Sequence, residues 1–201
     1  MRSPLQIRFL TETQSYAGPE LSPHWILGRT RIEGSALIAF TGSCHVKTEH
    51  LVDWEDRLGQ DFIRAESMLH FLGEFFGVSL ESGVWLQRTL VGIAKDVLTD
   101  LLPGWSGRLV RDGDDLFIDQ IIDQKKLSVS VVAPSIASVL LHFAINIDSA
   151  GAPVAAIGLK DLLNGQKESA FIPIFATKVL ERIQAEWASV SRACVKIRPV
   201  V

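Results

Sequence analysis

Hydrophobic side chains recur at helical spacing in three stretches of the chain. A helix is predicted over residues 81–102, where one stripe comprises Leu86, Leu90, Ile93, Ala94, Val97 and Leu101 and Pro103 ends the pattern. A second helix is predicted over residues 65–77, from the spacing of Met68, Leu69, Leu72, Phe75 and Phe76. A closing helix is predicted from Pro173 to Val190, with Phe175, Val179, Ile183 and Trp187 in one register.

Shorter apolar runs between turn-forming residues predict strands over residues 5–10, 35–42, 107–111, 114–118, 126–132 and 136–148. The strand at 35–42 is expected to end in a tight turn at Gly42. In the last strand, Val139, Leu141 and Phe143 alternate with Leu140 and His142, so its two faces differ. Successive strands without regular strand and helix alternation predict an α+β fold, a mostly antiparallel sheet flanked by helices.

Composition narrows the class of protein. The 201 residues are 47% hydrophobic and 21% charged, which predicts one folded domain over residues 1–201. A net charge of -3 gives no general attraction for nucleic acid. The sequence shows neither a membrane span nor a secretory signal, and its two cysteines, Cys44 and Cys194, lie far apart, so we expect a cytoplasmic protein. A homodimer is a reasonable expectation.

The densest cluster of reactive side chains is "GSCHVKTEHLVDWED", residues 42–56. A turn at Gly42 would expose backbone N–H groups to an anion, with Lys47 as counter-charge. Alternatively Cys44, His45, Glu49 and Asp53 would hold a metal in a hydrolase, although no spacing typical of zinc occurs and we predict no metal site. Residues 51–57 are equally consistent with an amphipathic helix whose acidic side chains are solvated.

His24 and Trp25 follow a turn-rich stretch and are candidates to line a ligand pocket, with Trp25 stacking on a ring. A partly buried aromatic cover explains them as well.

A second candidate site lies in "RDGDDLFI" and "KKLSVSVV". A lysine that opens a strand, Lys126, can reach a phosphate or carboxylate while the sheet holds its stem. Adjacent strand residues point to opposite faces, so only one of Asp114 and Asp115 is expected at a site. Ser128 and Ser130 share a face, which becomes a polar floor if it also holds His142 and Asn146. The plainer alternative is a solvated turn in which Lys125 and Lys126 pair with Asp119 or Asp123.

The phrases "SPHWI", "TGSCHVKTEHLVDWED", "RDGDDLFI", "KKLSVSV" and "AIGLKDL" resemble the uncharacterised, mainly archaeal family known as domain of unknown function 366. The order of "GDDLFI", "KKLSVSVV" and "LHFAINIDSAGAP" is also similar to the biotin and lipoate protein ligase fold, which is related to class II aminoacyl-tRNA synthetases. That resemblance implies that Lys126 contacts the carboxylate and phosphate of an acyl-adenylate, with Asp115 and Asn146 at matching positions.

This sequence departs from the ligase pattern at several points. Asp114 replaces an asparagine, the hairpin between Ile118 and Lys125 is longer, and Ser128 and Ser130 stand where glycine is usual. The loop rich in arginine and glycine, which would hold the nucleotide, is missing.

Three functions therefore remain as hypotheses. The first is acyl or nucleotidyl transfer on a small carboxylate or nucleotide-like ligand, with ATP as a candidate cofactor, Lys126 stabilising negative charge and Lys47 assisting. The second is a non-catalytic binding or interaction module that has lost the nucleotide loop. The third is the metal-dependent hydrolase.

Overall fold

The computed structural model describes residues 4–118, 124–198 and 200. A five-stranded sheet is its main layer, with β1 (Gln6–Phe9), β2 (Ala36–Val46), β3 (Ile63–Phe76), β8 (Ser138–Asp148) and β7 (Ser128–Pro134) side by side in that order. Only the pair of β1 and β2 is parallel among these strands. A smaller sheet contains β4 (Leu109–Asp112), β5 (Asp115–Ile118) and β6 (Lys125–Lys126).

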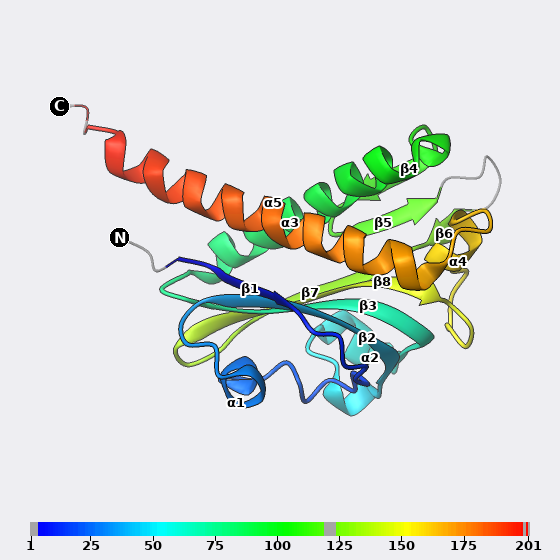
Figure 1. The fold of residues 1–201 in the computed structure, drawn as a ribbon. Helices are drawn as coiled ribbons and strands as arrows, with labels where there is room; N and C mark the ends of the chain where they lie inside the picture. Colours follow the sequence, from blue (N-terminus) through cyan, green and yellow to red (C-terminus); the bar gives the residue numbers. More distant parts are fainter. Residues whose placement is uncertain (1–3, 119–123, 199, 201) are drawn as a thin grey trace.

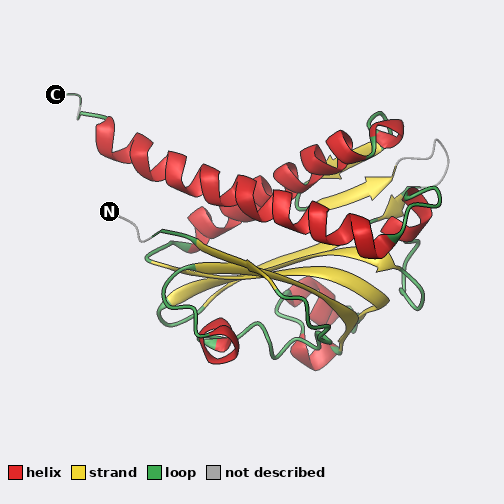
Figure 2. Ribbon diagram, in the orientation of Figure 1, coloured by secondary structure: helices red, strands yellow, loops and turns green. Residues whose placement is uncertain are grey.

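Two long helices, α3 (Leu80–Leu101) and α5 (Glu168–Lys196), cover one face of the main sheet (Figure 1). The opposite face carries the short helices α1 (Trp25–Thr30) and α2 (Trp54–Leu58) with their connecting loops (Figure 2). The remaining helical segments are α4 (Leu159–Leu162) and the 3-10 turns η1 (Thr48–His50) and η2 (Pro103–Trp105). The predicted α+β architecture, a mostly antiparallel sheet flanked by helices, is confirmed.

The predicted helix at residues 65–77 is wrong, because this segment is β3, the middle strand of the main sheet. Leu69, Phe71 and Phe75 face the cluster under α3 and α5, whereas Met68 and Leu72 belong to the cluster on the other face. A strand that is buried on both faces is apolar almost throughout, so its pattern also fits helical spacing.

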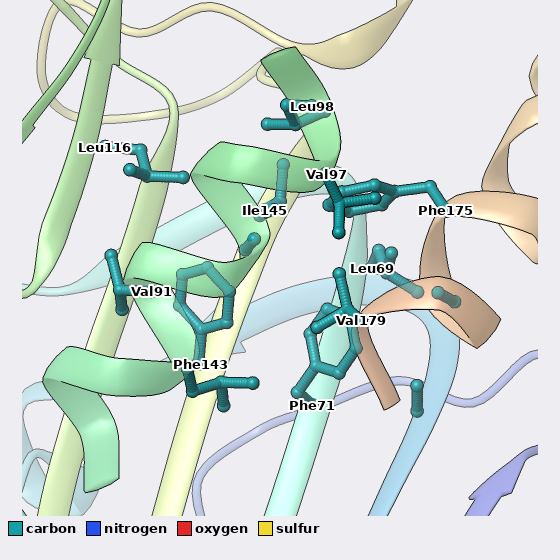
Figure 3. Close-up of a cluster of buried hydrophobic side chains, with 14 of the residues drawn as sticks. Leu69, Phe71, Val91, Val97, Leu98, Leu116, Phe143, Ile145, Phe175 and Val179 are labelled. Atoms are coloured by element: carbon teal, nitrogen blue, oxygen red, sulfur yellow. The ribbon is translucent and has the colours of Figure 1, made fainter. Parts of the chain in front are cut away.

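The other two predicted helices are confirmed. Ser79 caps α3 by accepting a hydrogen bond from the Ser82 amide, and the helix ends before Pro103. The closing helix α5 is longer at both ends than the predicted residues 173–190. Both helices pack apolar stripes on the sheet (Figure 3), where the buried side chains shown include Val91, Val97, Leu98, Phe143, Phe175 and Val179.

The tight turn expected at Gly42 is also wrong. Strand β2 continues through Val46, with only a register shift between Gly42 and Cys44. Gly42 is needed for a different reason: a β-carbon there would lie 1.9 Å from the carbonyl oxygen of Gln14. The segment around Gln14 and Tyr16 therefore lies directly against β2, and the Tyr16 amide donates a hydrogen bond to the Ser43 carbonyl.

Part of the hairpin between Ile118 and Lys125, with Asp119 and Asp123, lies outside the described residues. Within the described residues, no helix has both the length and the apolar character needed to span a bilayer.

The core on the side of α3 and α5 predicts a sharp difference between two truncations. Phe143→Ala is expected to lower the free energy of unfolding by about 3–5 kcal/mol, since the ring is fully buried and a cavity would remain. Ile136→Ala, at a fully exposed position, should change it by less than about 0.5 kcal/mol. Chemical denaturation measures both values, and a similar loss in the two variants would contradict the assigned core.

Candidate functional site

Lys126 and Asp115 form an ion pair where β5 and β6 meet. The Lys126 Nζ lies 2.7 Å from Asp115 Oδ2, and the two side chains are 32% and 18% exposed. Ser128 Oγ accepts a hydrogen bond from the Leu116 amide and lies 3.4 Å from Asp115 Oδ1, to which it donates. The sequence placed Lys126 and Asp115 in one candidate site without predicting this ion pair, and the structure shows that the ammonium is held by the protein.

The backbone of Lys126 is fixed from both sides. Its amide donates to the Ala155 carbonyl, and its carbonyl accepts from the Ile157 amide and from Asn146 Nδ2. Asn146 Nδ2 also donates to the Ile157 carbonyl at 3.2 Å. Asn146 therefore positions the backbone of Lys126, and its amide nitrogen is already used by the protein.

Burial dominates the electrostatics around Lys126. It raises the pKa of Asp115 above its usual value, while the Lys126 charge opposes that shift. Burial and the neighbouring Asp53 raise the pKa of Asp56 in α2, and the charge of Lys126 acts on this carboxyl too, in the lowering direction. Lys126 therefore lies close enough to α2 for its charge to be felt by two carboxylates from different elements.

Asp114 belongs to a separate network, as expected for the neighbour of Asp115. Its carboxylate lies 2.6 Å from Arg88 Nη1 and accepts hydrogen bonds from Gln87 Nε2 and Ser130 Oγ. Gln87 Nε2 also lies 2.6 Å from Ser130 Oγ, to which it donates. These contacts connect α3 to β7 on the side of the sheet that the helix covers.

The polar floor expected from Ser128, Ser130, His142 and Asn146 does not form. In the register of β7 and β8, Ser128 lies opposite Ile145 and Ser130 opposite Phe143. Residues directly opposite in an antiparallel pair share a face, so both serines lie on the side of α3. His142 and Asn146 occupy the other side, because they alternate with Phe143 and Ile145 along β8.

That other side contains a buried pair of histidines that the sequence did not predict as a unit. His70 Nδ1 lies 3.0 Å from His142 Nε2, and His70 Nε2 lies 3.2 Å from the Gly42 carbonyl oxygen. The Tyr16 ring stacks on His142 with a centroid separation of 3.7 Å and an interplanar angle of 9°. Burial lowers the pKa of His70 to about 4 and that of His142 well below its usual value, so both rings are neutral at pH 7.

A small pocket of about 70 Å³ opens beside His142. Its floor contains Val129 and Val131 of β7, and Tyr16 and Leu21 form one wall. The remaining lining comes mainly from residues 46–63, which fold over this face: Val46, His50, Leu51, Val52, Asp53, Asp56 and Ile63. The lining therefore combines apolar side chains with five ionisable groups, namely two carboxylates, two histidines and a tyrosine.

The cluster at residues 42–56 does not form the two sites that the sequence suggested for it. Residues 42–46 are strand, and the His45 amide donates to the Tyr16 carbonyl, so no open turn of amides faces an anion. Lys47 is exposed at the start of η1, and Asp53 caps α2 by accepting from the Glu55 amide at 2.8 Å.

The donors of the hypothetical metal site are also separated. Cys44 is buried, and burial raises the pKa of its thiol to about 12, which leaves it protonated and poorly nucleophilic. His45 and Glu49 are exposed, and His45 follows Cys44 on the strand, so their side chains point to opposite faces. No group of three or more potential metal ligands occurs within the described residues.

His24 and Trp25 lie at the start of α1 and do not line the pocket. The His24 amide donates to Glu74 Oε2 at 2.9 Å, and its ring lies 5.9 Å from that of Phe76. Trp25 packs near Phe40, with ring centroids 6.4 Å apart.

Tyr16 and His70 are the residues that sequence reasoning missed as part of this site, whereas Asp56 belongs to the cluster at residues 42–56 that it singled out. In a helix over residues 65–77, His70 would be expected to be a core histidine rather than part of a site. If they are assigned to a strand, His70 and His142 fall on the same face of neighbouring strands, which is the signal that could have found the pair.

Comparison with known proteins identifies relatives without an assigned activity. The family model described as a domain of unknown function (DUF366) matches residues 5–198. An uncharacterized protein of Methanocaldococcus jannaschii is 34% identical over 164 residues, which cover 79% of this chain and 71% of that protein. A solved protein of unknown function from Pyrococcus horikoshi has a TM-score of 0.84 at 28% identity and covers 98% of this chain and 100% of its own.

More distant solved structures are ligases. A mutant biotin protein ligase from Aquifex aeolicus in complex with biotin has a TM-score of 0.55 at 15% identity, over 91% of this chain and 70% of that chain. A lipoate-protein ligase A bound with ATP has a TM-score of 0.51 at 14% identity, over 90% and 85% of the two chains. At such low sequence identity, structural similarity shows the fold alone. It confirms the predicted biotin and lipoate ligase fold.

The buried histidines predict a dependence of stability on pH. Below about pH 6.5 the unfolded chain gains protons on these side chains, whereas folded His70 remains neutral down to about pH 4. Their contribution to stability is therefore lost as pH falls through this window, by up to about 1.4 kcal/mol per pH unit for each histidine.

His142→Gln isolates this contribution from those of the carboxylates, because the variant keeps an N–H near the position of Nε2 but removes one titrating ring. Denaturation of both proteins between pH 7 and pH 4 should show a shallower decline for the variant. Parallel curves would contradict the assignment of His142 as a neutral buried group.

Proposed function

The chain belongs to the family of the domain of unknown function 366 and has the fold of biotin and lipoate protein ligases, and from this premise we propose that it binds a small carboxylate. The ligand would lie on the face of the main sheet opposite α3 and α5, with its apolar part in the pocket beside Val129. Lys126 would supply the cation for its carboxylate. The observation that carries this proposal is the half-buried ammonium held by Asp115.

The ammonium of Lys126 is suited to this role because it has donors to spare. A lysine ammonium offers three N–H donors. Asp115 is the sole ion-pair partner of Lys126 within the described residues, at 2.7 Å. A ligand oxygen could therefore be added to the existing pair without leaving Asp115 unpaired, and a charge-assisted hydrogen bond of this kind is among the stronger ones available.

After binding, the carboxylate would either react with ATP or remain unchanged. In nucleotidyl transfer, a ligand carboxylate oxygen would bond to the α-phosphorus of ATP while the bond to pyrophosphate breaks, and Lys126 would stabilise the developing negative charge. Binding without transfer is the second candidate, which is favoured by the missing loop of arginine and glycine. In this chain residues 53–56 place Asp53, Glu55 and Asp56 over this face, and acidic groups repel a triphosphate.

Substitution of Lys126 tests the proposed binding. Lys126→Gln should weaken binding of a carboxylate by roughly 10- to 100-fold, the equivalent of one lost hydrogen bond to a charged group. Biotin, lipoate, octanoate and free amino acids are suitable probes in a thermal-shift screen, since a ligand that binds only the folded chain raises its apparent stability. Isothermal titration of the strongest probe then gives the dissociation constants.

Lys125→Gln is the matched control, because Lys125 is the adjacent lysine on β6 and has no ion pair among the described residues. It should bind the probe as the unmodified protein does. An equal affinity in the Lys126 variant, with an unchanged circular dichroism spectrum, would refute the proposal. An assay for pyrophosphate separates the two candidates, because ATP would release pyrophosphate only in the presence of the carboxylate if nucleotidyl transfer occurs, and not at all if the protein only binds the ligand.

A further inference from the structure

The Nδ1 atom of His142, a residue that lines the pocket, has no hydrogen-bond partner among the described residues. His142 is only 3% exposed, yet no hydrogen bond to its Nδ1 occurs among the described residues. Among the described residues, His142 contributes no fully enclosed nitrogen without a partner, which implies that its Nδ1 is not sealed off by protein atoms. The space that His142 lines is the pocket of about 70 Å³. Because Nε2 is bonded to His70, Nδ1 is the ring nitrogen of His142 that is available to a molecule in this pocket.

The chain of contacts behind His142 determines what this atom can do. A carbonyl oxygen only accepts hydrogen bonds, so His70 Nε2 must donate to Gly42. The Nδ1 of neutral His70 is then an acceptor, and His142 Nε2 must donate to it across 3.0 Å. This leaves the Nδ1 of neutral His142 with a lone pair and no proton. Gly42 thereby fixes the tautomer of a side chain two hydrogen bonds away.

The surroundings restrict what can approach that lone pair. Tyr16 stacks on one face of the His142 ring and holds its plane. Val129 and Val131 give the pocket apolar walls, and Asp53 and Asp56 are its carboxylates. A volume of about 70 Å³ has room for roughly five waters at the 10–15 Å³ that each requires, or for one small ring.

We propose that His142 is a specificity-determining residue, whose Nδ1 accepts a hydrogen bond from an N–H or O–H group on a small ring at the inner end of the ligand. This inference rests on the proposed function, since it places the ligand in the same pocket. It adds the chemistry of the end of the ligand that lies away from the carboxylate. The ligand would then combine a donor-bearing ring with a carboxylate that reaches Lys126. A ring that presents only acceptors or a methyl group to His142 would displace solvent from Nδ1 without replacing its hydrogen bond.

The tautomer can be measured without any ligand. Nitrogen-15 NMR of the full chain at pH 7 distinguishes protonated from unprotonated ring nitrogens. Both His70 and His142 are expected to carry their proton on Nε2. A proton on Nδ1 of His142 would overturn the inference, since the pocket would then require an acceptor.

A pair of isomeric probes tests recognition itself. Both 4-methylpyrazole and 1-methylpyrazole are neutral rings with the same number of atoms, but only the first has an N–H donor. In NMR titrations the first should bind about tenfold more tightly, as expected for one hydrogen bond to a buried acceptor. Equal affinities for the isomers, or no binding of 4-methylpyrazole, would overturn the inference.

Two variants separate this result from the proposed function. His142→Gln keeps a donor near Nε2 for His70 but removes the acceptor at the position of Nδ1, so it should lose the preference between isomers while remaining folded. Lys126→Gln should keep that preference, because neither pyrazole has a carboxylate. If Lys126→Gln keeps the preference between the pyrazole isomers and also binds the carboxylate as before, only the proposed role of Lys126 is refuted.

Discussion

The strict alternation of side chains along β3 and β8 is the constraint on which the rest of the structure depends. These two long antiparallel strands occupy the middle of the sheet, and they keep one register over nine residue pairs, from Met68 opposite Asn146 to Phe76 opposite Ser138. On one face Phe71 and Phe143 stack under α3 and α5, with ring centroids 5.7 Å apart. On the other face the same register brings His70 and His142 together. A shift by one residue would exchange the two faces, so core and site are specified by the same pairing.

This arrangement explains how neutral histidines and a lysine ammonium occur on the same side of the sheet. The histidines are kept neutral by burial inside the sheet layer, whereas Lys126 lies at the edge, where it is partly exposed and paired with Asp115. Segment 47–62 brings Asp56 within reach of the Lys126 charge. The proposed ligand would therefore meet the uncharged histidine inside the pocket and the ammonium of Lys126 outside its lining, which requires a small molecule with two different ends.

Sequence reasoning found the architecture and separated Asp114 from Asp115, because these depend on local patterns: strand length, turn residues and the alternation of strand side chains. It did not predict the ion pair of Lys126 with Asp115. It failed where tertiary context decides the outcome. Residues 65–77 fit a helix as well as a strand until burial on both faces is known. The side on which Ser128 and Ser130 lie depends on the register between β7 and β8, and Tyr16 reaches His142 only because Gly42 admits the chain beside β2.

Chemical-shift mapping of a carboxylate on the methyl groups of valine tests the central claim most directly, since valines mark both faces of the structure. Titration with octanoate is predicted to move the methyl signals of Val129 and Val131 in the pocket, and to leave Val110, in the groove between α3 and β4, unchanged. Shifts confined to Val110, or none at any valine up to millimolar ligand, would contradict a carboxylate site on the face opposite α3 and α5.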